Sequence, residues 1–185
     1  MMGEEGAYLR IDEADLRRFE AKLKGAAGGL RRVAARALNS AMGPVITATK
    51  KDAAERLGVA QKRIKTRVWP KKATASQLRA GVVTGTRDVM MIYAKAKQGK
   101  RGVKYTLEGA RHLEEGAFIA KAPDGQKLAW KRKGNAPLPL VVARTASPSD
   151  VLDKAYARRG VHVANARFLH RMHIETELLL SGRRA

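Results

Sequence analysis

Two histidines and a glutamate near the C-terminal end have the spacing closest to that of a metal site. His170, His173 and Glu177 stand at i, i+3 and i+7, which would place them on one face of a helix. Imidazole and carboxylate groups are common zinc ligands, but a helical His pair that binds one ion is usually separated by four residues, and here the separation is three. The other interpretation is a polar stripe opposite an apolar one, and we predict no metal site.

Other patterns that could perform catalysis are incomplete. Glu114 and Glu115 are adjacent, so their side chains diverge in a strand or a helix and cannot act together as an acid and a base. His112 and His162 have no nearby Ser–Asp pair, and the chain has no Cys. The segment 25–29 lacks the Lys-Ser/Thr ending of a P-loop. We therefore predict a protein that is not an enzyme and has no cofactor.

Lysine and arginine side chains in the middle of the chain are the remaining candidates for ligand binding. The chain has 38 Lys and Arg against 17 Asp and Glu, a net charge of +21, and residues 50–104 hold 16 of the basic and 3 of the acidic ones. This concentration favours a polyanion or an acidic protein as partner. The candidate basic surface consists of Lys50, Lys51, Lys62, Arg63, Lys65, Arg67, Lys71, Lys72, Lys95, Lys97, Lys100 and Arg101.

Few aromatic residues accompany this candidate basic surface. Trp69, Tyr93 and Tyr105 are near it in sequence, which gives little support for the stacking of bases, and no nucleic-acid recognition motif is present. The basic side chains therefore predict contact with phosphate groups, weakened by salt, without reading of base sequence. A solvated surface and a surface that meets an acidic protein remain as alternatives.

Helices are expected before the basic segment. Asp12 is a good N-cap for a first helix, and the Gly28-Gly29 pair should kink or break it. A second apolar stripe follows until Gly43-Pro44, which should interrupt the helix before it resumes and ends at Gly58. Small side chains in this stripe allow close approach to the same chain or to a neighbour. The candidate assembly face consists of Leu30, Val33, Ala37, Leu38 and Ala41.

The middle of the chain changes to the period of β-strands, and the end returns to helix. We expect strands at 77–83, 90–94 and 103–107, a hairpin over 118–131, and a last, edge strand at 138–142 that contains a proline. Ser147, Pro148 and Asp150 form the pattern of a capping box at the start of a helix that should end near Gly160. A final helix should run from about Ala164 to Gly182, with an apolar face made of Phe168, Leu169, Met172, Thr176, Leu179 and Leu180.

Together these elements predict one α+β domain over residues 1–185, with N-terminal helices, a central antiparallel β-sheet with hairpins, and C-terminal helices. Its parts are a helical arm at 12–57, a β-rich basic region at 63–143 and the C-terminal helices at 148–181. Because 31 residues are Ala and only 5% are aromatic, we expect a thin core that packs against copies of itself or partners. We expect no membrane contact, since no apolar run could cross a bilayer, and no signal peptide, since the first residues are acidic.

Several fragments, in order along the chain, resemble a known family. They are Arg36–Met42, Thr47–Lys51, Val59 with Lys62–Lys65, Leu78–Ala80, Gly116–Ala120, Trp130–Lys133 and Leu138–Val141. Over roughly residues 30–180 this order is similar to that of the phage minor tail protein Z family. The chain has Ala146–Ser149 where the family tends to have Gly-Pro-Ser after the last strand, and residues 12–27 match no part of the pattern.

This resemblance implies a structural virion protein of a tailed phage or prophage, which completes the tail at its head-proximal end by forming a ring. Its partners would be other tail or neck proteins and copies of itself, with non-specific contact with phage DNA. Its location would be the virion tail, and the host cytoplasm during assembly. The family supplies no catalytic residues. The alternative function is that of a non-specific, basic nucleic-acid-binding protein.

Overall fold

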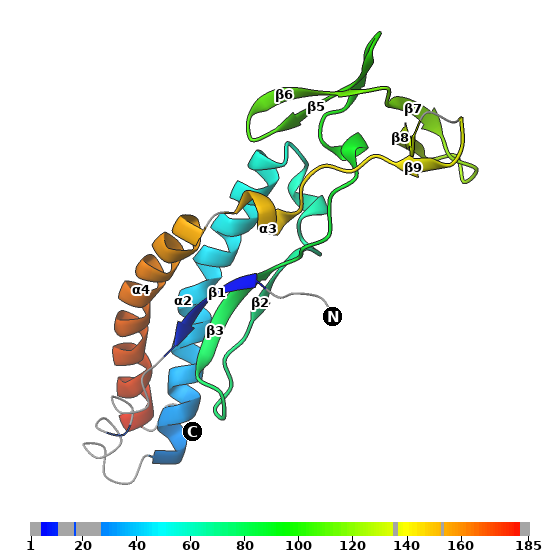
Figure 1. Cartoon of the computed structure of the whole chain (residues 1–185). Coiled ribbons are helices and arrows are strands. Elements are labelled where there is room, and N and C mark those ends of the chain that lie inside the picture. The colour runs from blue at the N-terminus through cyan, green and yellow to red at the C-terminus, as the bar shows by residue number, and fades with distance from the viewer. Residues whose placement is uncertain (1–4, 11–16, 18–26, 135–136, 153, 182–185) are drawn as a thin grey trace. The chain divides into compact units, whose positions relative to one another are not determined.

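A computed structural model gives the fold of the chain and describes residues 5–10, 17, 27–134, 137–152 and 154–181. The elements of the described residues (Figure 1) are, in chain order, β1 (Glu5–Arg10), α2 (Ala27–Arg56), η1 (Gln61–Arg63), β2 (Val68–Lys71), β3 (Arg79–Thr84), η2 (Met91–Tyr93), β4 (Lys97–Gln98), β5 (Gly102–Leu107), β6 (Ala110–Glu115), β7 (Phe118–Lys121), β8 (Lys127–Arg132), β9 (Leu140–Val142), α3 (Pro148–Val151) and α4 (Lys154–Leu180). The strands form three-stranded sheets with the orders β1-β3-β2, β4-β5-β6 and β7-β8-β9. Helices before and after the antiparallel hairpins confirm the predicted α+β class, and the strand β1 before α2 was not predicted.

The chain divides into two compact units, and each unit is assembled from separate segments. Unit 1 contains Thr49–Val68 and Thr84–Asp153, whereas unit 2 contains Glu5–Ala48, Trp69–Val83 and Lys154–Ala185. The predicted helical arm and β-rich region do not coincide with these units, because α2 passes from unit 2 into unit 1 and β2 and β3 belong mostly to unit 2. The assignment of the whole chain to one domain stays a prediction.

Helix α2 is continuous at Gly43-Pro44, where the sequence predicts an interruption. Gly28-Gly29 lies in the first turn of α2, and the residues 18–26 before this helix are outside the described ones. A proline inside a helix removes one hydrogen bond and costs about 3 kcal/mol. The side chains of Met42 and Val45 on either side of it are buried, so the packing of this helix offsets that cost. The predicted break at Gly43-Pro44 was wrong, whereas the break at Gly28-Gly29 stays a prediction, because the helix predicted at 12–27 lies almost wholly outside the described residues.

The candidate assembly face of α2 lies in the core of unit 2. Leu30, Val33, Ala37, Leu38 and Ala41 are all buried within the chain. Leu30 and Ala34 form a cluster with the half-buried side chains of Leu78, which precedes β3, and Met172, from α4. The five residues are therefore covered by the chain's own elements. The structure corrects their interpretation as a face free for contact with a neighbour.

A single amide side chain joins α2 to the segment between β2 and β3. The Asn39 Nδ2 group donates a hydrogen bond of 3.0 Å to the Ala73 carbonyl, and the Ala73 N–H group donates one of 2.8 Å to Asn39 Oδ1. Ala73 is buried, so its two backbone groups depend on this amide. Asn39 thus replaces the partner that a neighbouring strand would supply.

Helix α4 runs through Gly160, where the sequence predicts a helix end, and lies beside α2 in unit 2 (Figure 1). Its buried positions include Ala164, Glu175 and Thr176, whereas Leu169 is 63% exposed. Of the predicted apolar face, Phe168 and Met172 are half-buried and Thr176 is buried, as expected, whereas Leu169 lies on the exposed side and Leu179 and Leu180 lie outside the described side chains. Ala164, Phe168, Met172 and Thr176 are separated by multiples of four residues, which places them on one side of the helix.

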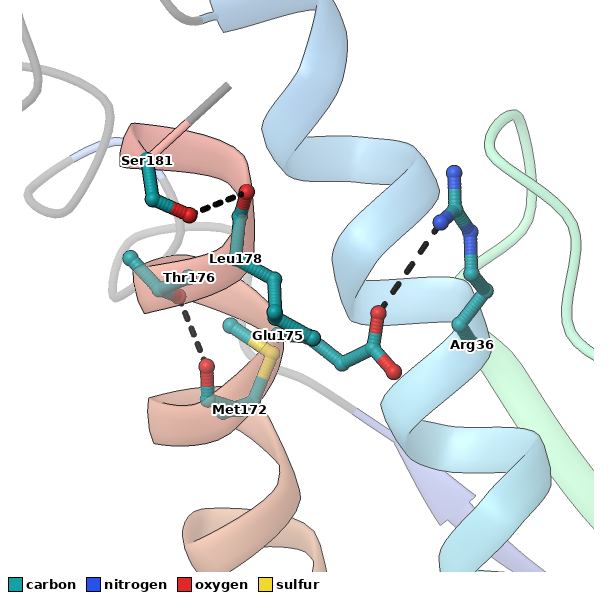
Figure 2. A network of polar contacts seen from close by, with 6 residues as sticks. All are labelled: Arg36, Met172, Glu175, Thr176, Leu178 and Ser181. Carbon is teal, nitrogen blue, oxygen red and sulfur yellow. Dashed lines mark hydrogen bonds and ion pairs between the residues drawn. The ribbon is translucent and has the colours of Figure 1, made fainter. Parts of the chain in front are cut away.

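Polar contacts accompany the packing of α4 on α2. Figure 2 shows the Glu175 carboxylate directed toward Arg36 of α2, with 3.9 Å between Glu175 Oε2 and Arg36 Nη1. The Thr176 hydroxyl donates a hydrogen bond of 2.7 Å to the Met172 carbonyl, and Ser181 Oγ donates one of 3.1 Å to the Leu178 carbonyl. These hydroxyl groups are satisfied within their own helix, so Glu175 carries the polar contact between the two helices.

Unit 1 is built around two antiparallel sheets. Its buried cluster contains Met91, Val103, Ala117, Ala129 and Ala143, so residues from β5 and β8 and from the segments beside β7 and β9 share one core. The predicted hairpin at 118–131 is confirmed as β7 and β8, paired from Phe118–Trp130 to Lys121–Lys127. The predicted last strand is β9 at the end of its sheet.

The remaining strand predictions had mixed outcomes. The predicted strands at 77–83 and 103–107 are present as β3 and β5. The predicted strand at 90–94 was wrong, because Met90 makes only an isolated bridge with Arg144 and the next three residues form η2. Strand β6 was not predicted, since its sequence, ARHLEE, has no apolar alternation and its stability comes from pairing with β5.

Helix α3 begins as the sequence predicts and ends earlier. The capping box between Ser147 and Asp150 is present, with the Ser147 N–H group donating to Asp150 Oδ2 at 2.8 Å. The helix ends at Val151, because Leu152 adopts an extended backbone. The Arg56 guanidinium donates a hydrogen bond of 3.0 Å to the Val151 carbonyl and so satisfies one acceptor at this end.

Candidate functional site

The candidate basic surface is divided between the two units. Unit 1 holds ten of its twelve residues, and unit 2 holds Lys71 and Lys72. Every one of the twelve side chains is exposed except those of Lys50 and Arg67, which are half-buried. In the segments 49–68 and 84–153 of unit 1, 20 basic residues stand against 9 acidic ones. Unit 1 therefore carries the largest part of the basic surface that the sequence predicts.

Two groups of basic residues that are separate in sequence meet through η1 and η2. The Arg63 guanidinium lies over the Tyr93 ring, with Cζ 3.9 Å from the ring centroid. A cation–π contact at an exposed site stabilises by about 0.5–1 kcal/mol. The contact between Arg63 and Tyr93 brings the basic residues around η1 next to the segment that begins with Lys95. The Lys95 backbone has φ of 52°, in the left-handed region that a residue with a side chain seldom adopts.

Acidic partners are unevenly distributed over this basic surface. At the end of α2, Lys51 lies 3.9 Å from Glu55, and Arg56 lies 3.0 Å from Asp52. At the turn between β4 and β5 the opposite holds, because Lys97 stands directly across from Lys104 in the ladder. Like charges in this position repel each other. The positive potential is consequently less compensated at the β4–β5 turn than at the end of α2.

A polar cluster on β5, β6 and β8 shows how part of unit 1 is neutralised. Lys131 donates a short hydrogen bond to Glu114, and the contact raises the pKa of Lys131 above its ordinary value of 10.5. Burial raises the pKa of Tyr105 above its ordinary value of 10.0, and the nearby Glu114 carboxylate adds to the effect. The Tyr105 ring stacks on His112 at 5.5 Å between centroids. The ion pair of Lys131 and Glu114 joins the two sheets of unit 1 and neutralises one cation of this surface.

Three arginines of unit 1 come together at another place. Arg67 follows η1, Arg87 follows β3, and Arg144 follows β9. Arg67 Nη1 donates to the Arg87 carbonyl at 2.5 Å, and Arg144 Nη1 donates to the Asp88 carbonyl at 3.3 Å. Of these three, only Arg67 belongs to the predicted basic surface. Arg87 and Arg144 were missed because 57 residues separate them in the chain, and no local spacing signals their approach.

The C-terminal histidines occupy different environments. His173 Nε2 lies 3.2 Å from Glu177 Oε1, and both side chains are largely exposed. His170 instead lines a cavity of about 380 Å³ between α2 and α4, together with Ser40, Ala41, Arg167, Arg171 and Ile174. In the part of the chain that the structure describes, no group of three or more His, Asp or Glu side chains is placed to hold a metal ion.

Comparisons with known proteins add no relative. No family model matches the chain, and no characterised protein or solved structure matches it significantly. None of the helices among the described residues is both long enough and apolar enough to span a membrane.

Proposed function

We propose that the chain is a structural virion protein of a tailed phage or prophage, which completes the tail at its head-proximal end through ring formation and contacts with other tail or neck proteins. The proposal includes the virion tail as its location, and the host cytoplasm during assembly. The order of the family-like fragments between residues 30 and 180 motivates it. Function in this case depends on surfaces that bind other subunits.

The observation that carries the proposal is the apolar edge of the β7-β8-β9 sheet. Leu138, just before β9, is 71% exposed, and Val141, within β9, is 41% exposed. β9 pairs with β8 on one side and ends the sheet on the other. An edge strand that exposes apolar side chains can accept a strand from a neighbouring subunit. On a chain with a net charge of +21, exposed apolar side chains at such an edge favour protein contact over solvation.

Native mass spectrometry of the purified full chain tests the proposal at the level of assembly. We expect multiples of the 20.2 kDa protomer, or co-assembly when tail or neck proteins from the same genome are added. Leu138→Asp should abolish these species, because it places a charge at the apolar edge. Leu169→Asp is the matched control, since Leu169 is a similarly exposed leucine on α4 of unit 2.

Two results would contradict the proposal. One is a protein that stays monomeric at every concentration and is absent from purified virions of the phage whose genome encodes it. The other is the formation of infectious particles with complete tails after deletion of the gene. Loss of assembly in Leu169→Asp without loss in Leu138→Asp would place the contact on α4 and remove the argument from β9.

A second candidate function is non-specific nucleic-acid binding. The observation in its favour is the excess of exposed basic side chains on unit 1, where Lys97 and Lys104 face each other and the side chains near η1 point into solvent. It predicts a duplex affinity that falls steeply with salt. Reversal of Lys62, Arg63 and Lys65 to Glu should abolish binding, and unchanged binding would exclude this surface.

A further inference from the structure

Three arginines of unit 1 meet at the loop after β3, outside the residues that ion pairs neutralise. They are Arg67, Arg87 and Arg144, which we call the arginine cluster: Arg67 Nη1 donates to the Arg87 carbonyl, and Arg144 Nη1 donates to the neighbouring Asp88 carbonyl. Among the described residues, no ion pair joins a carboxylate to any of the three. Arg87 and Arg144 are exposed and Arg67 is half-buried, so the cluster is accessible.

Two hydrogen bonds hold Arg67 beside the loop that carries Arg87. The Gly85 N–H group donates to the Arg67 carbonyl at 2.7 Å, and Arg67 Nη1 donates back to the Arg87 carbonyl. These two bonds fasten the loop after β3 to the segment that follows η1. Arg67 accepts one of these bonds through its carbonyl and donates the other through its guanidinium group. The two bonds together hold the Arg67 guanidinium group close to the backbone of Arg87.

A short ladder positions Arg144 beside the same loop. The Thr145 N–H group donates to the Val89 carbonyl at 2.8 Å, and the Met91 N–H group donates to the Ala143 carbonyl at 3.0 Å. Met90 and Arg144 form an antiparallel bridge between these bonds. Arg144 Nη1 then reaches the Asp88 carbonyl. The position of Arg144 is thus fixed by the fold of unit 1.

Repulsion between positive charges outweighs attraction to the nearby carboxylate at Arg67. Burial lowers the pKa of the Arg67 guanidinium, and repulsion from Arg87 and Arg144 lowers it further, while Asp88 acts in the opposite direction. An arginine remains charged after such a shift, because its ordinary pKa lies far above neutral pH. Arg67 is thus repelled by the positive charges of Arg87 and Arg144, and an anion would relieve this repulsion.

We propose that Arg67, Arg87 and Arg144 form a phosphate-binding site on unit 1, which takes a phosphate group from a nucleic-acid backbone or from free phosphate. The guanidinium group has planar, paired donors that match phosphate oxygens, and clusters of arginines are a recurrent means of phosphate recognition. A single carboxylate is saturated by one bidentate arginine, so three of them exceed what an isolated acidic side chain needs. This site is independent of the proposed assembly role.

The test uses the purified full chain and a short fluorescein-labelled DNA duplex of arbitrary sequence, with binding measured by fluorescence anisotropy. Arg87→Gln combined with Arg144→Gln should lower duplex affinity by at least about tenfold, since each substitution removes charge-assisted hydrogen bonds to phosphate. The control is Arg111→Gln combined with Arg132→Gln, two exposed arginines of β6 and β8 in the same unit. It removes the same charge and should change the affinity by less than about threefold.

A conservative variant distinguishes a specific phosphate-binding site from general electrostatic attraction. Arg67→Lys, Arg87→Lys and Arg144→Lys together keep the charge and lose the paired donors, so we expect affinity to fall here as well. Circular dichroism confirms that each variant is folded. Arg87→Gln alone is the safest variant, because in the described residues the Arg87 side chain makes no hydrogen bond or ion pair and only its carbonyl does.

A second arm distinguishes the source of the phosphate. Inorganic phosphate is titrated into ¹⁵N-labelled protein while the arginine Nε–Hε signals are followed by NMR. Dependence of duplex binding on the cluster assigns the site to a nucleic-acid backbone, and dependence of the phosphate shifts alone assigns it to free phosphate. Equal losses in the Gln pair and its control, full binding by the Lys variant, or no dependence of either ligand would overturn the proposal. Equal dependence of poly-L-glutamate binding would also overturn it, in favour of an acidic protein.

Discussion

The turn between β5 and β6 depends on the backbone conformation of two residues. Glu108 has φ of 50° and Gly109 has φ of 78°, so both lie in the left-handed region that a two-residue hairpin of type I′ requires. Glycine adopts this region freely, whereas glutamate adopts it at a cost. Asn and Asp tolerate it better than other residues with side chains, and Glu108 is therefore a position where the sequence is not optimal for the fold.

Glu108→Asn should raise the free energy of unfolding by about 0.5–1 kcal/mol, because Asn-Gly is the favoured type I′ sequence. Urea denaturation followed by circular dichroism measures it. Gly109→Ala is the control: nothing lies within 4 Å of an added Cβ, so its expected loss of about 1 kcal/mol comes from the backbone alone. A lower stability of Glu108→Asn would contradict the assigned turn.

Asn39 gives a second prediction for a single residue. Asn39→Ala should lower the free energy of unfolding by about 1–3 kcal/mol, since both backbone groups of the buried Ala73 lose their partner. Asn39→Asp should destabilise as well, because a carboxylate accepts from the Ala73 N–H group but repels its carbonyl. Thermal unfolding measures both. The control is Ser40→Ala, an exposed neighbour on α2; equal effects at 39 and 40 would show that the amide is not the cause.

For single residues, the sequence predicts a contact only when the two partners are close to each other along the chain. The capping box of Ser147 and Asp150 was predictable, because three residues separate its members and the contact is local. Asn39 was visible only as part of a family-like fragment, with no indication of its bond to Ala73. Arg87 and Arg144 could not be paired from sequence at all, since the ladder between 89–91 and 143–145 brings them together.

At the scale of elements, local signals predicted hairpins well and helix ends poorly. The β7–β8 hairpin was predicted from the turn at 123–125, where Gly125 has φ of 81°. Gly43-Pro44 and Gly160 are also strong local signals, yet both lie inside helices. Whether a helix continues through such residues is decided by the burial of one of its sides, and this burial depends on partners that are distant in sequence. Helix length is consequently harder to predict than a two-strand hairpin.

Gly43→Ala tests the continuity of α2. Gly43 is exposed, and nothing lies within 4 Å of an added Cβ. Alanine should therefore raise the free energy of unfolding by about 0.5–1 kcal/mol, the difference between the two residues inside a helix. Denaturant unfolding measures the change, with Gly125→Ala in the β7–β8 turn as a control that should destabilise. A loss of stability in Gly43→Ala would indicate that the helix is interrupted there.

The contact between β6 and β8 predicts how stability changes at alkaline pH. The folded chain raises the pKa values of Lys131 and Tyr105 above 10.5 and 10.0, so both groups contribute stability that is fully present below about pH 10. That contribution is lost as the pH rises through the folded-state values. We expect the melting temperature to fall from about pH 10 upward, and to fall less steeply in Lys131→Met or Tyr105→Phe. Lys127→Met, on the same strand, should keep the wild-type profile.

At the scale of the whole molecule, net charge and exposed apolar side chains have opposite effects on self-association. A net charge of +21 makes copies of the chain repel one another, whereas Leu138 and Val141 favour contact between subunits. The sequence predicted the excess charge and its concentration, because both are matters of composition. It did not predict which unit each residue joins, since both units are assembled from segments that are distant along the chain.

Salt should therefore separate assembly from nucleic-acid binding. Raising the salt from about 0.05 to 0.5 M shortens the screening length to a few ångströms, so repulsion between copies weakens and self-association through apolar contacts should strengthen. Over the same range duplex binding should fall by at least about a hundredfold, because the salt dependence follows the number of phosphates neutralised. Sedimentation velocity at several salt concentrations measures the first quantity, and fluorescence anisotropy of a labelled duplex measures the second. Association that weakens with salt in parallel with DNA binding would mean that ionic contacts hold the copies together, and it would remove the β9 edge as their interface.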